Sequence, residues 1–249
     1  MDLKEIHIWN IKYNLLTVDE IVMIVNKWLS EGRKGVHLTG ADAYVTVLAQ
    51  KDELLHRAIM ESDIVNVDSY YPTKMLAKQG YEIRERVTTP DVMEGFLKSA
   101  NEKGQKIYLL GAKEETLQAL IEILKRDYPN MKIVGFHNGY FKEEEEDAIA
   151  EAISKVAPDY LFLGMPTPRK EHFILKYKRK IDVGVFLGVG GAFDARANVM
   201  KRPPKFMRGH GLEAFFRVLR SPRVYGKRLH IFREFDKLVE EYNNKLKDN

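Results

Sequence analysis

The sequence predicts an α/β protein with a Rossmann-like parallel sheet, helices on both faces of the sheet, and a helical appendage at the C-terminal end. Six short β-rich runs recur along the chain, and each of them ends in small or polar residues. Between the runs lie segments with apolar residues at the three- and four-residue spacing of amphipathic helices. Nearly continuous apolar strands that alternate with helices are typical of a parallel sheet covered on both faces.

The predicted strands are VHLTG (36–40), DIVNVDS (63–69), KIYLLGA (106–112), KIVGFHNGYF (132–141), DYLFLGM (159–165) and VGVFLGVGG (183–191). The predicted helices are 17–29, 89–104, 113–129 and 143–158. The first helix begins with a capping-box pattern, in which Thr17 precedes Glu20. Because ligands of open α/β sheets bind outside the carboxyl ends of the strands, the residues that end each run are candidates for a functional site.

The composition changes after the last apolar strand, where the segment KRPPK begins. Its two consecutive prolines cannot continue regular strand pairing, so we expect a catalytic domain over 1–195 and an appendage over 196–249. Within the appendage, Ser221 and Pro222 have the pattern of an N-cap and a first helical residue, which predicts two helices. Apolar residues at helical spacing support the second helix: Tyr225, Leu229, Phe232, Phe235, Leu238, Val239 and Tyr242.

The net charge of +4 is unevenly distributed along the chain. Residues 196–249 hold 14 Lys/Arg and 6 Asp/Glu, whereas residues 1–195 carry a net charge of −4. Within the appendage, residues 200–233 contain ten Lys/Arg and a single acid, with Phe and Leu between the charges. Basic residues interleaved with apolar ones fit an anionic membrane surface better than a nucleic acid. The sequence therefore predicts a membrane-associating appendage and no nucleic-acid partner.

Other features of the composition restrict the class of protein. The 249 residues include no cysteine, which excludes disulfides and thiolate metal ligands. No apolar run approaches the roughly 18–20 residues that span a bilayer, and the N-terminus MDLKEIHIW lacks the layout of a signal peptide. These observations predict a cytoplasmic protein. No histidine pair has metal-binding spacing and no Asp-x-Asp follows a strand, so no metal site is predicted.

Polar side chains at or near the predicted strand ends are candidates for chemistry. Asp68 is either a turn-forming residue or a general base that takes a proton from a hydroxyl. Thr39 is either the cap of a following helix or a catalytic residue. Lys170 falls in a first helical turn, where positive charge is disfavoured, and this position indicates an anionic neighbour. Arg86 is either a surface ion-pair residue or part of the site, and His137 is either a hydrogen-bonded strand-end histidine or a catalytic one.

The glycine-rich segments do not match the common phosphate-binding motifs. Neither G-x-G-x-x-G nor G-x-x-x-x-G-K-[ST] occurs in the first strand–turn–helix units. GVGGAFD (188–194) follows a strand, and its glycines either permit a tight turn or allow the backbone to approach a ligand phosphate. The residues by themselves leave these two interpretations open.

Three segments carry a family resemblance. In the first, KIYLLGA leads through a helix and Tyr-Pro to IVGFHNGYF; the second is YLFLGMPTPRKEHFI; the third is VGVFLGVGGAFD followed by KRPPKFMRGHGLEAFFRVLRSPR. In this order they resemble motifs of the WecG/TagA/CpsF glycosyltransferases, glycosyltransferase family 26. The motifs are G-[GA]-x before I-V-G-x-x-x-G-Y-F, then L-G-x-P-x-Q-E, and finally G-V-G-x-x-F-D with R-A-P, L-E-W-x-x-R and P-x-R. The likeness covers about residues 6–230.

The resemblance implies an inverting hexosyltransferase that needs no metal or other cofactor. Such an enzyme transfers a sugar from a UDP-sugar to a polyprenyl-diphosphate-linked saccharide at the inner face of the plasma membrane, in cell-envelope polysaccharide or teichoic-acid-type synthesis. By position, Asp68 matches the general base, Thr39 the threonine beside it, Arg86 the arginine of E-R-V-x-G-x-D, and Lys170 a glutamine. Family likeness and the apolar appendage also predict self-association.

Two further sets of residues are implied by the resemblance. The nucleotide-binding set is Gly111, Gly135, His137, Gly139, Tyr140, Phe141, Gly164, Pro166, Gly188, Gly190, Gly191 and Asp194. The arginines implied to approach the diphosphate are Arg217, Arg223 and Arg228.

The chain departs from the family pattern at three places. Ala41 replaces the asparagine of T-x-N, Ser69 replaces the glycine of Asp-Gly, and Thr89-Pro90 replaces the glycine segment of E-R-V-x-G-x-D. The implied nucleotide segments are retained. We therefore expect UDP to be the nucleotide and the sugar or acceptor to differ from the N-acetylmannosamine transfer of well-known members. The alternative is a catalytically altered nucleotide-sugar-binding or scaffolding protein of the same fold.

Overall fold

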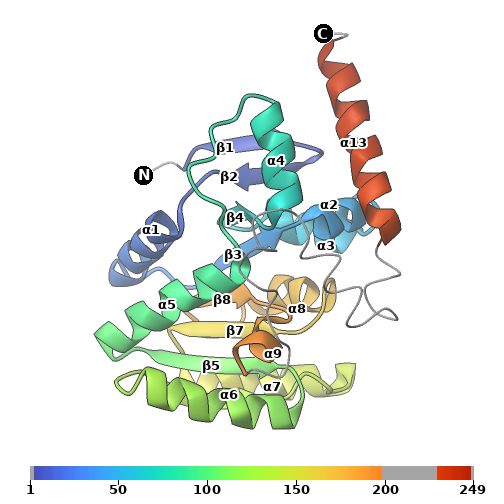
Figure 1. Cartoon of the computed structure of the whole chain (residues 1–249). Helices are drawn as coiled ribbons and strands as arrows, with labels where there is room; N and C mark the ends of the chain where they lie inside the picture. The colour runs from blue at the N-terminus through green and yellow to red at the C-terminus, as the bar shows by residue number, and fades with distance from the viewer. Residues whose placement is uncertain (1–2, 198–228, 248–249) are drawn as a thin grey trace.

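The computed structural model describes residues 3–197 and 229–247, and its centre is a six-stranded parallel sheet (Figure 1). All neighbouring strands of this sheet run parallel. Across the sheet the strands are β4 (Ile64–Val67), β3 (Val36–Ala41), β8 (Val185–Gly188), β7 (Tyr160–Gly164), β5 (Lys106–Gly111) and β6 (Lys132–His137). This arrangement confirms the predicted α/β, Rossmann-like fold.

Helices cover both faces of the sheet because side chains of opposite parity along each strand are apolar. The hydrophobic core on one face contains Leu38, Leu109, Phe162 and Leu187, and the core of the other face contains Val65, Leu110, Leu163 and Phe186. The first face packs against α1 (Val18–Ser30), α5 (Thr89–Lys103), α6 (Glu114–Asp127) and α9 (Ala192–Arg196). The second packs against α2 (Ala43–Ala49), α3 (Glu53–Met60), α7 (Glu146–Val156) and α8 (Arg169–Tyr177).

The start of α1 confirms the predicted capping box. The Thr17 hydroxyl accepts a hydrogen bond from the Glu20 backbone N–H at 3.2 Å, and the Glu20 carboxylate accepts one from the Thr17 N–H at 2.9 Å. The cap of α2 differs from the interpretation that assigned it to Thr39. The Asp42 carboxylate is the cap, because it accepts from the Val45 N–H at 2.8 Å, while Thr39 lies inside β3.

Several other elements were not among the predictions. An antiparallel hairpin of β1 (Glu5–Ile8) and β2 (Ile11–Asn14) lies beside β4, and the Asn14 side chain accepts from the Val65 N–H at 2.9 Å. Helices α3 and α4 (Tyr70–Lys78) flank β4 in the sequence. The hairpin strands contain charged and polar residues such as Glu5, Lys12 and Asn14, so they lack the continuous apolar runs by which the sheet strands were predicted.

The C-terminal helix α13 (Leu229–Lys247) packs on the body of the protein. Its Phe235 is 0% exposed, with ring centroids 4.8 Å from Trp9 and 5.7 Å from Tyr71. Val239 and Ile231 belong to the same core as the hairpin and α2. The predicted helical spacing is therefore confirmed for 229–247, and the apolar face of this helix packs against the body of the protein.

The remainder of the predicted appendage lies outside the described residues. It includes the basic stretch 198–228, the Ser221-Pro222 pattern, and Arg217, Arg223 and Arg228. The proposed domain boundary at residue 195 thus stays a prediction. In the described part of the chain, no helix combines the length and the apolar character needed to cross a membrane.

Candidate active site

The carboxyl ends of the strands meet at one edge of the sheet, where the chain places its candidate residues. From β7 the chain continues to β8 on one side, whereas from β5 it continues to β6 on the other, so the strand order reverses between β7 and β5. A reversal of this kind opens a crevice at the carboxyl edge of an α/β sheet. The candidate residues follow β3 and β4 at one end of the sheet, and β8, β7, β5 and β6 across the rest of it.

Asp68 directly follows β4 and is held by two neighbouring segments. Its backbone N–H donates to the Ala41 carbonyl at 3.2 Å, which ties it to the end of β3. Its Oδ2 accepts a hydrogen bond from the Thr89 hydroxyl at 2.7 Å. The next residue, Ser69, has a left-handed φ of 76° and is the N-cap of α4, without a side-chain capping bond. Asp68 is half-buried at the sheet edge, and its carboxylate contacts a segment that is distant in the sequence.

Gly40 lies against Asp68 and Thr89, where there is no room for a side chain. A Cβ at Gly40 would lie 2.0 Å from the Thr89 hydroxyl oxygen and 3.1 Å from Asp68 Oδ2. Asn66 is the register partner of Gly40 on β4. Its Nδ2 is buried and has no hydrogen-bond partner among the described residues. The Asp68 carboxylate, the Thr89 hydroxyl and the Asn66 amide therefore lie on the same face of the sheet, near the carboxyl ends of β3 and β4.

Thr39 does not join this group. Its hydroxyl lies 2.9 Å from His37 Nε2 and 2.9 Å from Ser62 Oγ, and the residue is buried. Because side chains alternate along a strand, Thr39 lies on the opposite face of β3 from Gly40. The structure therefore corrects the expectation that Thr39 stands beside Asp68.

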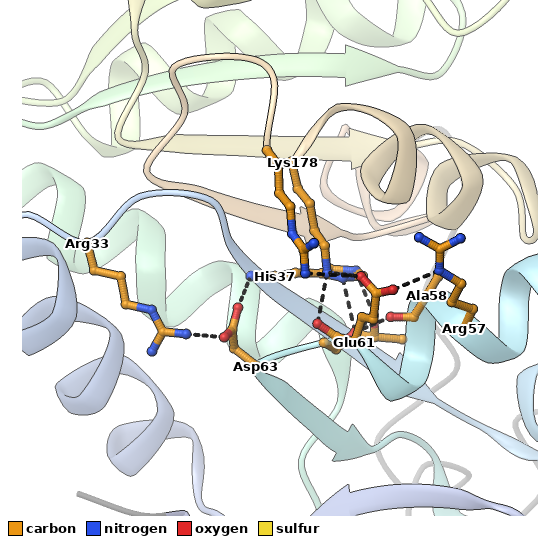
Figure 2. Close-up of polar contacts among 10 residues, drawn as sticks. Arg33, His37, Arg57, Ala58, Glu61, Asp63 and Lys178 are labelled. Atoms are coloured by element: carbon orange, nitrogen blue, oxygen red, sulfur yellow. Dashed lines mark hydrogen bonds and ion pairs between the residues drawn. The ribbon is translucent and has the colours of Figure 1, made fainter.

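The buried histidine beside Thr39 belongs to a polar cluster near the start of β3 (Figure 2). The His37 backbone N–H donates to Asp63 at 2.8 Å, and the Lys178 ammonium donates to the Glu61 carbonyl at 2.8 Å. Burial, and then the charge of Lys178, hold the pKa of His37 well below its ordinary value, so the ring is neutral. Sequence inspection missed this cluster, because a histidine in an apolar strand does not reveal its partners.

Lys170 has the anionic neighbour that its position predicts. The residue lies in the first turn of α8, and its ammonium contacts the Glu171 carboxylate and the Thr167 hydroxyl. The aliphatic part of Lys170 covers Gly188 at the end of β8, where a Cβ would lie 2.9 Å from the lysine Cδ. Glu171 is 1% exposed, and its Oε2 is buried with no hydrogen-bond partner among the described residues.

Three glycines pack the ends of β5, β6 and β7 against one another. Gly111 has a φ of 136°, and a Cβ there would lie 2.4 Å from the Gly164 carbonyl carbon. A Cβ at Gly139 would lie 3.0 Å from the Gly111 Cα. The Gly164 carbonyl also accepts the Ala112 N–H at 2.9 Å. These positions of the implied nucleotide-binding set come together at the carboxyl edge, where the absence of side chains allows the backbone segments to pack closely.

Arg169 fixes the loop after β6, a role that sequence reasoning missed. Its guanidinium donates to the Gly139 carbonyl at 2.7 Å and to the Phe141 carbonyl at 2.6 Å, and it lies 4.2 Å from the centre of the Phe141 ring. The loop holds Tyr140 with 73% of its surface exposed. In the sequence, Arg169 stands between Pro168 and Lys170. Two adjacent basic residues after a proline indicate a polar role, but the pattern does not show which of the two binds the loop after β6.

The other members of the implied nucleotide-binding set are more scattered. Gly135 lies inside β6, where a Cβ would meet the Tyr108 ring at 2.4 Å, so packing rather than ligand approach explains it. His137 ends β6, with Nδ1 2.8 Å from the Asn138 carbonyl oxygen. Asp194, in α9, accepts from the Thr116 hydroxyl at 3.3 Å. Pro166, Gly190 and Gly191 lie in the loops after β7 and β8.

Arg86 lies in the irregular segment between α4 and α5, three residues before Thr89, and is half-buried. A small, shallow surface hollow lies beside this segment. It is lined by Asn14, Leu15, Leu16, Val67, Ile83, Arg84, Glu85 and Val87. Among residues 3–197 and 229–247, no three His, Asp or Glu side chains are arranged to hold a metal ion.

These features define a class of protein: a doubly wound α/β protein whose candidate site, with a half-buried carboxylate and close-packed glycines, lies at the carboxyl edge of the sheet. The family is specified by sequence comparison. The model of the "Glycosyl transferase WecG/TagA/CpsF family" matches residues 6–245. The chain belongs to this family, which confirms the resemblance.

Several curated relatives share one name, N-acetylglucosaminyldiphosphoundecaprenol N-acetyl-beta-D-mannosaminyltransferase. The protein of Bacillus subtilis strain 168 is 26% identical over 245 residues, which cover 98% of this chain and 94% of the relative. That of Bacillus spizizenii strain W23 is 27% identical over 198 residues, 80% of this chain and 76% of the relative. That of Staphylococcus aureus strain MW2 is 30% identical over 178 residues, 69% and 68% of the two chains.

Proposed function

We propose that this protein transfers a hexose or hexosamine unit from a UDP-sugar to a polyprenyl-diphosphate-linked saccharide. The transfer inverts the anomeric configuration, needs no metal or other cofactor, and takes place at the cytoplasmic face of the membrane. The relatives' name supports the acceptor class, because it specifies a sugar on diphosphoundecaprenol as the acceptor. The observation that carries the proposal is the Asp68 carboxylate at the carboxyl edge of the sheet, beside Thr89 and Gly40.

Asp68 is the general base in this proposal. Its carboxylate takes the proton of the acceptor hydroxyl, whose oxygen forms a bond to the anomeric carbon of the donor. The bond between that carbon and the diphosphate oxygen breaks on the opposite side, and UDP leaves with the electron pair. One displacement with one base gives inversion at the anomeric centre.

The negative charge that develops on the departing UDP requires positive groups and backbone N–H donors. Lys170 and Arg86 are the candidates among the described residues, and Lys170 is oriented by its contacts with Glu171 and Thr167. Arg217, Arg223 and Arg228 lie outside the described residues and are candidates because arginine binds phosphate in a bidentate manner. The close-packed glycine backbone at the carboxyl ends of β5 and β7 is the proposed nucleotide site.

The sugar or acceptor is proposed to differ from that of the named relatives. Thr89 contacts Asp68 directly, and Ser69 follows it with a left-handed backbone. Ala41, whose carbonyl binds the Asp68 N–H, has no polar side chain to offer a sugar. All three departures from the family pattern therefore adjoin the proposed base rather than the proposed nucleotide site.

Incubation of the purified chain with a panel of UDP-sugars and polyprenyl-diphosphate-linked acceptors tests the proposal. We expect transfer in at least one pairing, a product of inverted configuration by NMR, and an unchanged rate after treatment with EDTA. No transfer in any pairing argues against the enzyme, retention of configuration against the single displacement, and loss of activity with EDTA against metal independence.

Asp68→Asn is the matched variant, because it keeps the shape of the side chain and removes the basic oxygen. We expect a fall in kcat of about 10²–10⁴-fold, the usual contribution of a general base, with UDP affinity unchanged by calorimetry. Retained turnover would remove Asp68 from the base role.

A nucleotide-sugar-binding or scaffolding protein without catalysis is the second candidate. The burial of Thr39 on the far face and the loss of an asparagine at Ala41 favour it. UDP binding with no turnover on any acceptor would select this alternative.

A further inference from the structure

The Thr89 hydroxyl is a side-chain group that orients the proposed base. It donates to Asp68 Oδ2 at 2.7 Å, although the two residues are 21 positions apart in the sequence. Thr89 is 5% exposed and is the first residue of α5, directly after the N-cap Thr88 and before Pro90. The cap, the proline and the β-branched side chain restrict the backbone and χ1 of this position, so the donor is held in place before any substrate binds.

The neighbouring strand has a matching feature. Gly40 carries no side chain at the point where a Cβ would lie 2.0 Å from the Thr89 oxygen and 3.1 Å from Asp68 Oδ2. The hydrogen bond between Thr89 and Asp68 thus depends on a glycine at position 40. Gly40, Asp68 and Thr89 come from β3, the end of β4 and the start of α5, and together they form one packed unit.

From this arrangement we infer that Thr89 is a positioning residue for Asp68, an inference that rests on the proposed function. A hydrogen bond to Asp68 Oδ2 restricts rotation of the carboxylate and thereby limits the directions in which Oδ1 can point. The same bond favours the ionised form, which is the form that accepts a proton. Thr89 therefore contributes to both the orientation of the Asp68 carboxylate and the pH range in which Asp68 acts.

Thr89→Val tests the inference because it keeps the branched shape and removes the donor. We expect kcat to fall about tenfold, in line with the loss of one hydrogen bond to a charged group, with the KM for the donor and the affinity for UDP unchanged. The acidic limb of the kcat–pH profile should move to higher pH. Thr89→Ser, which keeps the hydroxyl, should restore both kcat and the profile.

Thr88→Val is the matched control, since it makes the same chemical change one residue earlier. Thr88 caps α5, where its hydroxyl accepts from the Asp91 N–H at 3.4 Å, so this variant should lower stability without moving the pH profile. A Thr89→Val enzyme with the kcat and pH profile of the wild type would overturn the inference.

A double-mutant cycle examines the same unit from the side of β3. Gly40→Ala should reduce kcat more than Thr89→Gly does, because its methyl group displaces the Thr89 hydroxyl. In the double variant Gly40→Ala/Thr89→Gly, kcat should return to that of Thr89→Gly alone. Additive losses would mean that the two positions act independently and would contradict the packed unit.

A separate measurement distinguishes failure of this inference from failure of the proposed function. If the wild type transfers no sugar, the enzyme proposal fails, and the Asp68 carboxyl can still be titrated by NMR in the wild type and in Thr89→Val. A titration that moves to higher pH in the variant, but not in Thr88→Val, supports the positioning role. Identical titrations overturn it.

Discussion

His37 is a neutral histidine buried in a protein with a basic excess. Burial is the largest cause of its lowered pKa, and the charges of Lys178, Lys170 and Lys12 add to it. Its ring nitrogens lie 3.1 Å from the Ser62 oxygen and 2.9 Å from the Thr39 oxygen, so two hydroxyls satisfy the ring without a carboxylate. A residue in this state contributes to the pH dependence of folding rather than to catalysis.

The sign of this contribution follows from linkage. In the unfolded chain, a histidine takes up a proton below a pH of about 6.5, whereas folded His37 does not until far lower pH. The unfolded state therefore binds more protons below that pH, and the free energy of unfolding falls there, with a slope that approaches about 1.4 kcal/mol per pH unit. Above that pH the contribution is constant.

We expect His37→Gln to remove this slope. Urea denaturation at pH 5 and pH 7 should show a smaller pH dependence for the variant than for the wild type. His7→Gln is the control, because His7 has 62% of its side chain exposed and should leave the slope unchanged. Equal pH dependences for the wild type and His37→Gln would show that His37 is not the group responsible.

Helix α13 is an integral element of the fold. Its Phe235 contacts Trp9 of the hairpin and Tyr71 of α4, and the Tyr71 hydroxyl donates to Asp236 of α13. Burial, followed by the hydrogen bond to Asp236, raises the pKa of Tyr71 to about 12, so the phenol stays protonated as a donor. Because α4 begins two residues after Asp68, α13 supports the segment that carries the proposed base.

Phe235→Ala should reduce the free energy of unfolding by about 3–5 kcal/mol, the usual loss for a fully buried phenylalanine. Urea denaturation measures it, with the exposed Glu241→Ala as a control that should remain within about 0.5 kcal/mol of the wild type. A loss below about 1 kcal/mol for Phe235→Ala would mean that the helix does not pack on the body in solution.

The whole molecule combines a mildly acidic body with a basic C-terminal part. Since α13 contributes Phe235 to the core, a chain that ends near residue 195 would also lose packing, and truncation cannot isolate a membrane role. Substitutions within the basic stretch of the full chain keep α13 and change only charge. A test of membrane binding with lipid vesicles therefore compares the wild type with a variant in which Arg217, Arg223 and Arg228 are each changed to Gln.

We expect the wild type to co-sediment with vesicles that contain anionic lipid, and to do so less at high salt. The triple Gln variant should bind more weakly by about 3 kcal/mol, since each basic residue near an anionic surface contributes about 1 kcal/mol. Neutral vesicles are the control and should pellet little of either protein. Equal pelleting of both proteins with anionic vesicles would contradict the membrane role of this stretch.

The sheet was predictable because buried parallel strands are continuous apolar runs, and the positions that end them were correctly expected at one edge. Asp68 and Lys170 lie near this edge and stay predicted site residues, and the anionic neighbour of Lys170 is its sequence neighbour Glu171. The face of β3 on which Thr39 lies was not predictable, since a shift of one residue along a strand moves a side chain to the other face of the sheet. Thr39 lies with Ser62, a partner 23 positions away that no local pattern indicates.

The sequence by itself determined the α/β class, the capping of α1, the helical spacing of α13 and the family, because each depends on local periodicity or on motifs in a set order. Only the tertiary structure decided which face of β3 Thr39 occupies, that α13 packs on the body, and that Thr89 binds Asp68. These outcomes depend on contacts between segments far apart in the chain, and a sequence pattern records which residues are apolar but not which partners cover them.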